Sequence, residues 1–237
     1  MLERLSRNGR GVFRFRALQT RAGVIQWSAN GGDILEIRLG APRRRDFGTA
    51  IRFARTGMHF DWYTQNPLLL FLYGRYFWCL EYGRATRAIA AYRGDALAGV
   101  LLADVRGAKK PYRTLGRRLY VRLFEAAQEL LFRGGGDVYA RANRELFAQY
   151  EKTHAPEGEI TFLAVDPALE GQGVGTLLLG ELARREAGRE FYLYTDNGCN
   201  YAFYEHRGFE RAGERDIVMH LNGKAVPLRC FLYRKWL

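Results

Sequence analysis

Three glycines alternate within five residues of this chain, at Gly171, Gly173 and Gly175. They precede a stretch, 176–186, whose apolar residues recur at helical spacing. The N-terminus of a helix leaves backbone N–H groups unpaired and carries partial positive charge, so it attracts phosphate. Because glycine has no Cβ, the backbone can approach an anion closely at these positions. One glycine would be enough for an ordinary turn, so three together favour a phosphate-binding turn.

The spacing of the glycines separates two kinds of phosphate ligand. A dinucleotide fingerprint has the form G-x-G-x-x-G directly after a strand. Here the spacing is G-x-G-x-G, with Thr176 at the place of the last small residue, and residues 166–170 separate strand from glycines. Asp196, at the end of the next expected strand, could stand in for the acid that binds a ribose. A nucleotide-dependent oxidoreductase is therefore the less favoured alternative.

The elements that must position this turn follow from the pattern of apolar residues. Alternating apolar residues predict strands, and apolar residues at helical spacing predict helices. The expected strands are 34–39, 87–92, 98–105, 159–165, 190–195, 209–219 and 228–235, and the expected helices are 46–56, 66–82, 115–131, 138–152, 173–186 and 200–207. Residues 93–95 predict a hairpin turn, and Asp46 is expected to cap the helix that follows it.

Two segments stand apart from the regular pattern. Residues 1–32 are rich in arginine, glycine and small polar residues, so we expect a basic N-terminal extension. Such a segment could be a disordered arm or a transit-like sequence, although its scattered apolar residues leave packing open. Residues 33–237 form the expected main domain, and within it 106–158 is expected to be a helical insertion.

Composition and charge limit the class of protein. The chain has 237 residues, of which 48% are hydrophobic, and this is enough to bury a core. Cys79, Cys199 and Cys230 give neither a disulfide framework nor a metal-binding spacing, so we expect no metal and a reducing, cytoplasmic location. The longest uncharged run in the apolar region, 62–74, is shorter than the roughly 20 residues that span a bilayer, so we expect no membrane partner.

The formal net charge of +12 attracts anions such as phosphorylated cofactors and nucleic acid. Ten arginines fall within residues 1–45. Much of the excess charge therefore lies away from the glycine-rich turn, which makes it weak support for a nucleic-acid partner.

Two motifs resemble those of the GNAT superfamily of acetyltransferases. The main motif of that family runs V-x-P-x-x-[RQ]-x-x-G-x-[GA], and residues 165–175 read V-D-P-A-L-E-G-Q-G-V-G. Glu170 departs from it, because the family usually has Arg or Gln there and an acid opposes a diphosphate. A second motif, N-x-x-A-x-x-[FL]-Y-x-x-x-G-F, resembles residues 197–209, with Asn200 at the alanine position. The resemblance covers 159–237 and extends in weaker form over 33–105.

This resemblance implies an α/β (α+β) fold, in which a mixed, mostly antiparallel central sheet has helices on both faces and is split near its centre by acetyl-CoA, the co-substrate. Backbone N–H groups of the turn would hold the CoA pyrophosphate, namely those of Gln172, Gly173, Val174, Gly175 and Thr176. The pantetheine arm would lie against Leu163 and Val165, between the strands 159–165 and 190–195. The N–H of Leu163 would polarise the thioester carbonyl, and Asn197 would contact the arm.

The same resemblance implies catalytic roles for two residues. Tyr204 matches the general acid of the family, and its ordinary pKa of about 10 keeps it protonated at neutral pH. Glu159 is the candidate general base, although an ordinary glutamate is a poor base for an ammonium group unless burial raises its pKa. Glu159 also lies four residues before Leu163, about 13 Å along a strand, so a water relay is expected. The alternatives are a tyrosine that covers the core and an exposed glutamate at a strand start.

Other residues are weaker candidates for the site. His154 and His206 are reserve bases, and Cys199 is expected to be a bystander near the cofactor. Four aromatic residues of 62–76 either wall the acceptor site or belong to the core, namely Trp62, Tyr63, Tyr73 and Tyr76.

The resemblance therefore implies an acetyl-CoA-dependent N-acetyltransferase that moves an acetyl group directly to a primary amine. We expect a small-molecule acceptor ahead of a protein, and we leave a homodimer open. Two other classes stay as alternatives. One is a non-catalytic CoA-binding sensor or interaction module, and the other is an RNA- or ribosome-associated protein that uses the basic residues 1–32.

Overall fold

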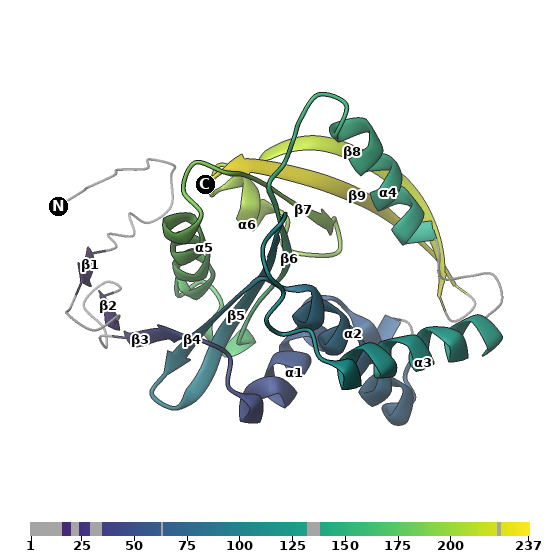
Figure 1. Cartoon of the computed structure of the whole chain (residues 1–237), viewed down its shortest axis with the longest axis horizontal. Helices are drawn as coiled ribbons and strands as arrows, with labels where there is room; N and C mark the ends of the chain where they lie inside the picture. Colours follow the sequence, from purple (N-terminus) through teal and green to yellow (C-terminus); the bar gives the residue numbers. More distant parts are fainter. Residues whose placement is uncertain (1–15, 20–23, 29–34, 63, 132–137, 222–223) are drawn as a thin grey trace.

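A computed structural model describes residues 16–19, 24–28, 35–62, 64–131, 138–221 and 224–237 (Figure 1). Within these ranges nine strands form one sheet, in the order β1-β2-β3-β4-β5-β6-β7-β9-β8. Every neighbouring pair is antiparallel except β6 and β7, which run parallel. Helices lie on both faces of the sheet. The predicted fold class is therefore confirmed.

The strands are β1 (Arg16–Gln19), β2 (Val24–Ser28), β3 (Leu35–Gly40), β4 (Arg87–Arg93), β5 (Ala96–Val105), β6 (Gly158–Val165), β7 (Glu190–Asp196), β8 (Glu210–Leu221) and β9 (Lys224–Trp236). The helices are α1 (Phe47–Gly57), α2 (Pro67–Arg84), α3 (Leu115–Leu131), α4 (Val138–Tyr150), α5 (Val174–Arg185) and α6 (Ala202–Glu205). Three short 3-10 helices lie between them, η1 (Arg44–Asp46), η2 (Phe60–Trp62) and η3 (Pro167–Leu169).

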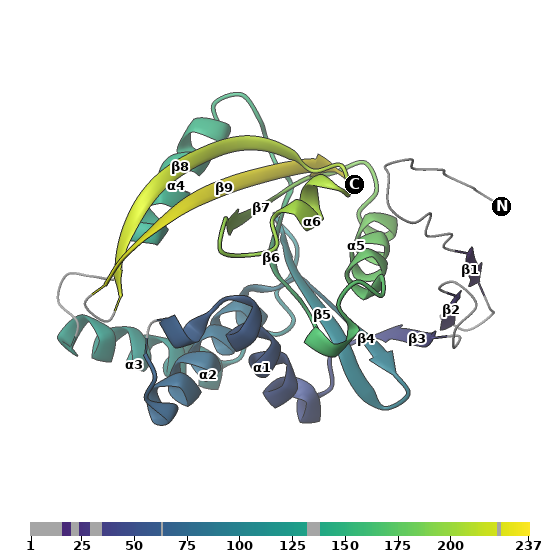
Figure 2. The same ribbon diagram turned by 180° about the vertical axis from the view of Figure 1, so that it is seen from behind.

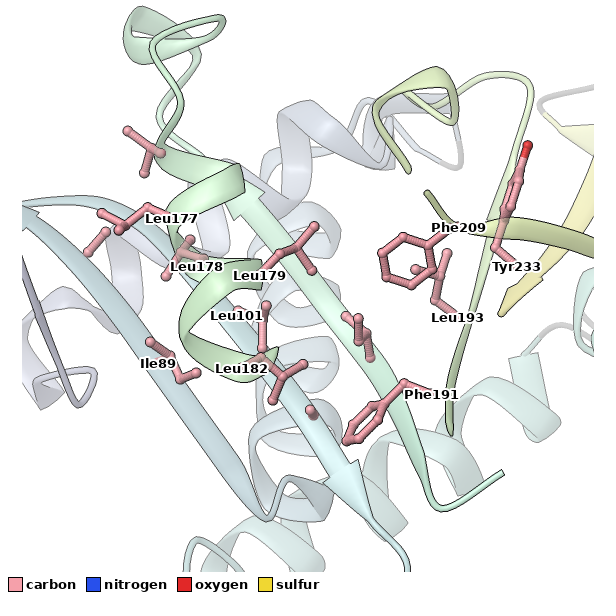
Figure 3. Close-up of a cluster of buried hydrophobic side chains, with 14 of the residues drawn as sticks. Ile89, Leu101, Leu177, Leu178, Leu179, Leu182, Phe191, Leu193, Phe209 and Tyr233 are labelled. Carbon is pink, nitrogen blue, oxygen red and sulfur yellow. The ribbon is translucent and has the colours of Figure 1, made fainter. Parts of the chain in front are cut away.

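The core of the first half of the molecule lies around β4 and β5, which are buried on both faces. Helix α5 covers one face, where its Leu178 and Leu182 pack over Ile89 and Leu101 (Figure 3). Helices α1 and α2 cover the other face, where aromatic side chains such as Trp78 pack against the sheet. Burial on both faces explains why the two strands read as continuous apolar runs in the sequence.

The N-terminus of α2 is fixed by its own sequence. The side-chain oxygen of Asn66 accepts hydrogen bonds from the backbone N–H groups of Leu68 (2.9 Å) and Leu69 (3.2 Å), and proline stands at the first helical position. Asp46 precedes α1 as expected, but its side chain caps no N–H group. It accepts instead from the hydroxyl of Tyr92 (3.0 Å), because that buried hydroxyl competes for it. The predicted cap is therefore wrong in this detail.

The second half of the molecule is built on β7 and the long β8–β9 hairpin (Figure 2). Helix α4 crosses one face of this hairpin, where Leu146 and Tyr150 pack against Cys230 and Leu232. Helix α3 lies instead against α2, and Phe124 of α3 stacks on Tyr76 with ring centroids 4.5 Å apart. The two helices of the predicted insertion thus belong to different halves.

At the N-terminal edge, β1 and β2 extend the sheet beyond β3. The rest of residues 1–32 lies outside the described ranges, so the boundaries given for the extension and the insertion stay predictions. No helix within the described ranges is both long enough and apolar enough to cross a membrane.

Candidate active site

A gap opens in the sheet where β6 and β7 separate. The two strands pair only at Gly158–Phe191 and Glu159–Tyr192, and no pairing follows beyond these positions. Strand β6 stays paired with β5 along its other edge, and β7 stays paired with β9. The sheet therefore remains continuous at the start of the two strands and is open toward their ends (Figure 2).

The backbone of β6 directs hydrogen-bonding groups into this gap. Antiparallel partners alternate between pairs that exchange hydrogen bonds and pairs that do not. The N–H of Asp166 donates to the carbonyl of Ala98 (2.9 Å), which makes that pair a bonded one. The register then makes the pairs formed by Val165 and Leu163 non-bonded ones. Their N–H and C=O groups consequently point away from β5 and into the gap.

A β-bulge in β6 changes which face each side chain occupies. The register with β5 shifts between Phe162 and Ile160, which leaves Thr161 without a partner. In a regular strand Glu159 and Leu163 would share a face, because side chains alternate with a period of two. Here Glu159 reaches Arg84 of α2, whereas Leu163 packs on the α5 side. The bulge thus places the carboxylate on the face opposite to the Leu163 side chain.

The glycine-rich turn lies beyond the end of β6. Asp166 accepts from the N–H of Ala168 (3.0 Å) and fixes the short helix η3. Gly171 and Gly173 then have φ of 77° and 82°, the left-handed region that side chains disfavour. Helix α5 begins directly afterwards, so its first N–H groups have no partner one turn earlier.

Gly175 has a packing role as well. A Cβ at this position would come within 2.9 Å of the Phe203 ring. The absence of a side chain therefore allows α5 to lie close to α6. The turn has the backbone form that an anion cradle needs.

Two charged residues flank the turn. Arg207 donates from Nε to the hydroxyl of Thr176 (2.8 Å), and its guanidinium lies 3.9 Å from the Phe203 ring centroid. Glu170 accepts from the side-chain amide of Asn200 (3.4 Å). Arg207 thus supplies positive charge beside the start of α5, where the motif has an acid in place of its usual Arg or Gln. The sequence does not predict a role for Arg207, which stands at an unspecified position of the second motif.

Tyr204 lies on the α5 side of the gap. Its ring packs against Phe203, Phe209 and, more distantly, Tyr233. Burial raises the pKa of Tyr204 above its ordinary value of 10, so the hydroxyl stays protonated at neutral pH. Within the described residues that hydroxyl has no hydrogen-bond partner. A neutral, unengaged O–H group is what a proton donor requires.

Glu159 belongs to a cluster of charged groups at the closed end of the gap. Its carboxylate is paired with the guanidinium of Arg84 and accepts from the hydroxyl of Tyr192 (3.2 Å). Burial raises the pKa of Glu159, although Arg84 and Tyr192 act in the opposite direction. Glu81 of α2 lies 3.7 Å from the same guanidinium.

Glu81 is the more strongly perturbed of the two carboxyl groups. Burial raises its pKa from 4.5 to about 7, and one of its oxygens is buried without a hydrogen bond. The sequence analysis predicted Glu159 but neither Arg84 nor Glu81, because the two latter residues approach Glu159 only through the packing of α2 on the sheet.

The loop after β7 is held on both sides. Asn197 exchanges hydrogen bonds with the backbone of Arg229 through its own backbone N–H (3.0 Å) and its side-chain oxygen (2.8 Å). Across the gap, His59 has φ of 51° and its ring contacts the carbonyl of Gly198 (3.1 Å). Trp62 stacks on that imidazole at 4.5 Å. This part of α1–α2 thus docks on the loop that carries Asn197.

The weaker candidates lie at the edges of this arrangement. His154 stacks on Tyr150 at the end of α4, and His206 is exposed directly after α6. Burial raises the pKa of Cys199 to about 12, which makes its thiol a poor nucleophile. Tyr73 and Tyr76 pack between α2 and α3, and Tyr63 lies outside the described residues. Across the described ranges no three His, Cys, Asp or Glu side chains gather as a metal site would need.

The structure therefore brings the glycine turn, the exposed edge of β6, Tyr204 and Glu159 to one gap. Glu159 and Tyr204 occupy opposite faces of it, Glu159 beside α2 and Tyr204 on the side of α5. The open end of the gap meets the glycine-rich turn, and its closed end holds the carboxyl groups of Glu159 and Glu81.

Comparison with known proteins agrees with this geometry. Residues 134–211 match the model of an acetyltransferase (GNAT) domain. The N-alpha-acetyltransferase RimI of Mycobacterium tuberculosis is 34% identical over 93 residues, which cover 38% of this chain and 57% of that protein. An uncharacterized protein of Mycobacterium leprae is 47% identical over 66 residues, which cover 26% of this chain and 18% of that protein. The chain thus matches only part of the length of each relative.

Two solved structures share the fold. A histone acetyltransferase HPA2 and related acetyltransferase from Corynebacterium glutamicum has a TM-score of 0.51 at 14% identity, over 82% of this chain and 93% of that one. A protein of the yellow fever mosquito, named as an arylalkylamine N-acetyltransferase, has a TM-score of 0.52 at 15% identity, over 85% and 89% of the two chains. The motifs, the matched residues 134–211 and the fold thus agree in their likeness to GNAT acetyltransferases.

Proposed function

We propose that this protein is an acetyl-CoA-dependent N-acetyltransferase that transfers the acetyl group directly to a primary amine. The observation that carries the proposal is the parting of β6 and β7 after only two pairs. It leaves the main-chain groups of Leu163 and Val165 facing a gap that ends at the glycine turn. A polar, extended ligand with phosphates at one end fits these features, and the pantetheine arm and pyrophosphate of CoA are such a ligand.

Each part of the chain has a defined task in binding. The N–H groups from Gly173 to Thr176 hold the pyrophosphate at the start of α5. The N–H of Gln172, the fifth predicted donor, instead donates to the carbonyl of Leu169 (3.2 Å). Leu163 and Val165 hydrogen-bond the arm in place of a missing strand, and Asn197 contacts the arm from the loop after β7. Bound acetyl-CoA supplies the acetyl thioester, and the N–H of Leu163 polarises its carbonyl group.

Two side chains handle the protons. The amine acceptor must lose a proton, which Glu159 receives through a water molecule, and the raised pKa of Glu159 makes it a better base than an ordinary glutamate. The departing sulfur must gain a proton, which Tyr204 donates. Their separate positions suit direct transfer, because the amine and the sulfur are different substituents of the tetrahedral carbon and each needs its own proton-transfer group.

Glu170 weakens phosphate binding at the glycine-rich turn, and Arg207 offsets this effect. A carboxylate beside the pyrophosphate repels it, whereas the Arg207 guanidinium, held by Thr176, attracts it. We propose a small molecule as the acceptor in preference to a protein. We also propose a cytoplasmic location for the protein.

The experiment that tests the proposal is thermal unfolding with acetyl-CoA, with NADH as control. A ligand at 100 times its Kd stabilises by about 2.7 kcal/mol, which shifts the Tm of a protein of this size by roughly 5–10 °C. A shift with acetyl-CoA alone, followed by thiol release with a panel of amines, supports the enzyme. No shift at millimolar acetyl-CoA overturns the proposal.

A non-catalytic CoA-binding module remains the second candidate, because the ion pair with Arg84 engages Glu159, the predicted base. This hypothesis predicts the same Tm shift with acetyl-CoA but no thiol release with any amine.

A further inference from the structure

A cavity of about 340 Å³ lies between the C-terminal part of α2, the segment after β5 and the start of α3. Three separate elements thus contribute to one wall. Six cationic side chains line it, namely Arg84, Lys110, Arg113, Arg117, Arg118 and Arg122. Glu125 is the single acidic residue of the lining. We call this cavity the basic pocket.

Much of the positive charge in the basic pocket is uncompensated. Lys110 pairs with Asp104 (2.7 Å), and Arg117 lies 4.9 Å from the Tyr82 ring centroid. Three others, Arg113, Arg118 and Arg122, have side chains with no ion pair or hydrogen bond to any described residue. Like charges held together without partners repel each other, so an anion that enters the pocket relieves this repulsion.

The basic pocket is separate from the proposed cradle for CoA phosphates. Lys110 and Arg113 follow β5, whose last residue pairs with Gly158 at the start of β6. The glycine turn lies beyond the other end of β6, and the eight residues of this strand span roughly 23 Å at about 3.3 Å per residue. The phosphates of CoA therefore have their own site, and the basic pocket is available for another anion.

Arg84 connects the basic pocket to the reacting groups. Its guanidinium lines the pocket and is paired with Glu159, the proposed base at the closed end of the gap. An acceptor whose amine approaches Glu159 can therefore extend past Arg84 toward Arg118 and Arg122. The pocket lies on the α2 face, the face from which Glu159 acts.

We propose that the basic pocket binds an anionic group of the acceptor, so the preferred acceptor is a primary amine that also carries a carboxylate or phosphate. This inference rests on the proposed N-acetyltransferase function and specifies its substrate class. It also explains how a chain of net charge +12 attracts its acceptor, because a polycationic amine would be repelled by this wall.

The test compares two double variants of equal charge change. Arg118→Gln with Arg122→Gln removes two unpaired cations of the basic pocket. Arg38→Gln with Arg93→Gln removes two exposed cations from neighbouring strands on the far side of the molecule, β3 and β4. Both lower the net charge by two, so a general charge effect would appear equally in each.

The kinetic readout uses matched acceptors of the same length, an aminoalkyl phosphate, an aminoalkyl carboxylate and the corresponding neutral amino alcohol. The wild type is expected to prefer the two anionic amines. The pocket variant should raise KM for them about tenfold or more, with kcat and the neutral acceptor nearly unchanged, and the β3–β4 variant should change KM less than twofold. Equal losses for all acceptors, or a wild-type preference for the neutral amine, would overturn the inference. A short acidic peptide with a free N-terminus is measured as a further acceptor. Its kcat/KM relative to the anionic amines shows whether the acceptor is a protein or a small molecule.

A binding experiment distinguishes a failure of this inference from a failure of the proposed function. Thermal unfolding is measured with the aminoalkyl phosphate in the presence of CoA, for the wild type and both double variants. If the aminoalkyl phosphate raises the Tm of the wild type and of the β3–β4 variant but not of the pocket variant, and no amine is turned over, the pocket binds anions but the proposed enzymatic function is refuted. Stabilisation by single-stranded RNA or by phosphatidylglycerol vesicles, with none by the anionic amines, would refute an acceptor site in the pocket.

Discussion

Glu159 and Tyr204 illustrate how a fold changes the meaning of single residues. Glu159 was expected as a base that burial would have to tune, and the structure buries it but also pairs it with Arg84. Tyr204 was expected as an acid, and it is half-buried with a raised pKa and an unengaged hydroxyl. The two groups are suited to opposite tasks, since one holds a negative charge and the other retains its proton.

Replacing Tyr204 by Phe removes the proton donor and keeps the ring that packs against Phe203 and Phe209. We expect kcat to fall by about 10²- to 10⁴-fold, which is the usual contribution of general acid catalysis. The Kd for acetyl-CoA, measured by calorimetry, should stay within about twofold. Tyr201→Phe, which alters a neighbouring tyrosine that packs against Phe231, is the matched control. An unchanged kcat would show that Tyr204 serves only to cover the core.

Glu81 makes stability depend on pH. Its folded-state pKa of about 7 lies above the ordinary 4.5, so the folded state binds the proton more tightly than the unfolded state. The stabilisation from this group is complete below pH 4.5 and is lost as pH rises through 7. The shift corresponds to roughly 3 kcal/mol at most, at about 1.4 kcal/mol per pKa unit.

Glu81→Gln should therefore flatten the fall in unfolding free energy between pH 5 and pH 8, as measured by urea denaturation. Glu151→Gln, at an exposed position after α4, should leave the fall as it is in the wild type. If wild type and Glu81→Gln show the same slope, Arg84 compensates the buried charge and Glu81 ionises as an ordinary glutamate.

At the scale of elements, the turn between β6 and α5 depends on backbone conformations that only glycine adopts easily. Gly171 and Gly173 have positive φ, and Gly175 leaves room for the Phe203 ring. Glycine is thus required at these three positions for two different structural reasons. Two allow the chain to turn back toward the gap, and one allows α5 and α6 to pack closely.

Gly173→Ala tests the turn. A residue with a Cβ at φ of 82° costs about 1–2 kcal/mol, and we expect both a lower Tm and at least tenfold weaker acetyl-CoA binding, because the first N–H groups of α5 would shift. Gly180→Ala, inside α5 with no atom within 4 Å of the added Cβ, should be neutral or stabilising by about 0.5–1 kcal/mol. A lower Tm with unchanged affinity would show that the turn does not hold the ligand.

For the whole molecule, charge is distributed unevenly between the sheet edge and the site. Residues 1–32 contain six arginines and one glutamate, so their removal lowers the formal net charge from +12 to +7. The residues that we propose to bind CoA lie on β6, α5 and the loop after β7. In the sheet, β3, β4 and β5 separate β6 from β2, and β1 and β2 only extend the sheet beyond β3.

We expect a variant that lacks residues 1–32 to bind acetyl-CoA with the affinity of the full chain, as measured by calorimetry. Any binding of single-stranded RNA by the full chain should weaken steeply with salt, because it would rest on phosphate contacts. If the truncated protein loses RNA binding and the full chain acetylates no amine, the RNA-associated alternative gains over the enzyme.

The sequence by itself determined the elements and the chemistry that lies close together along the chain. Hydrophobic periodicity predicted the helices α1–α6 and the strands β3–β9 but not β1 and β2. Alternate glycines predicted the turn, because these features depend on backbone conformation and on neighbours within a few residues. The second motif placed Tyr204 among the site candidates for the same reason, and the resemblance of the strand 159–165 to the family placed Glu159 there.

Only the tertiary structure decided what faces the gap. The bulge at Thr161 sends Glu159 and Leu163 to opposite faces, and a strand pattern does not reveal such a bulge. Arg84 meets Glu159 across 75 positions of sequence, and Arg207 meets Thr176 across 31. These contacts arise from helices that pack on a sheet, so their partners are set by the positions of whole elements rather than by sequence spacing.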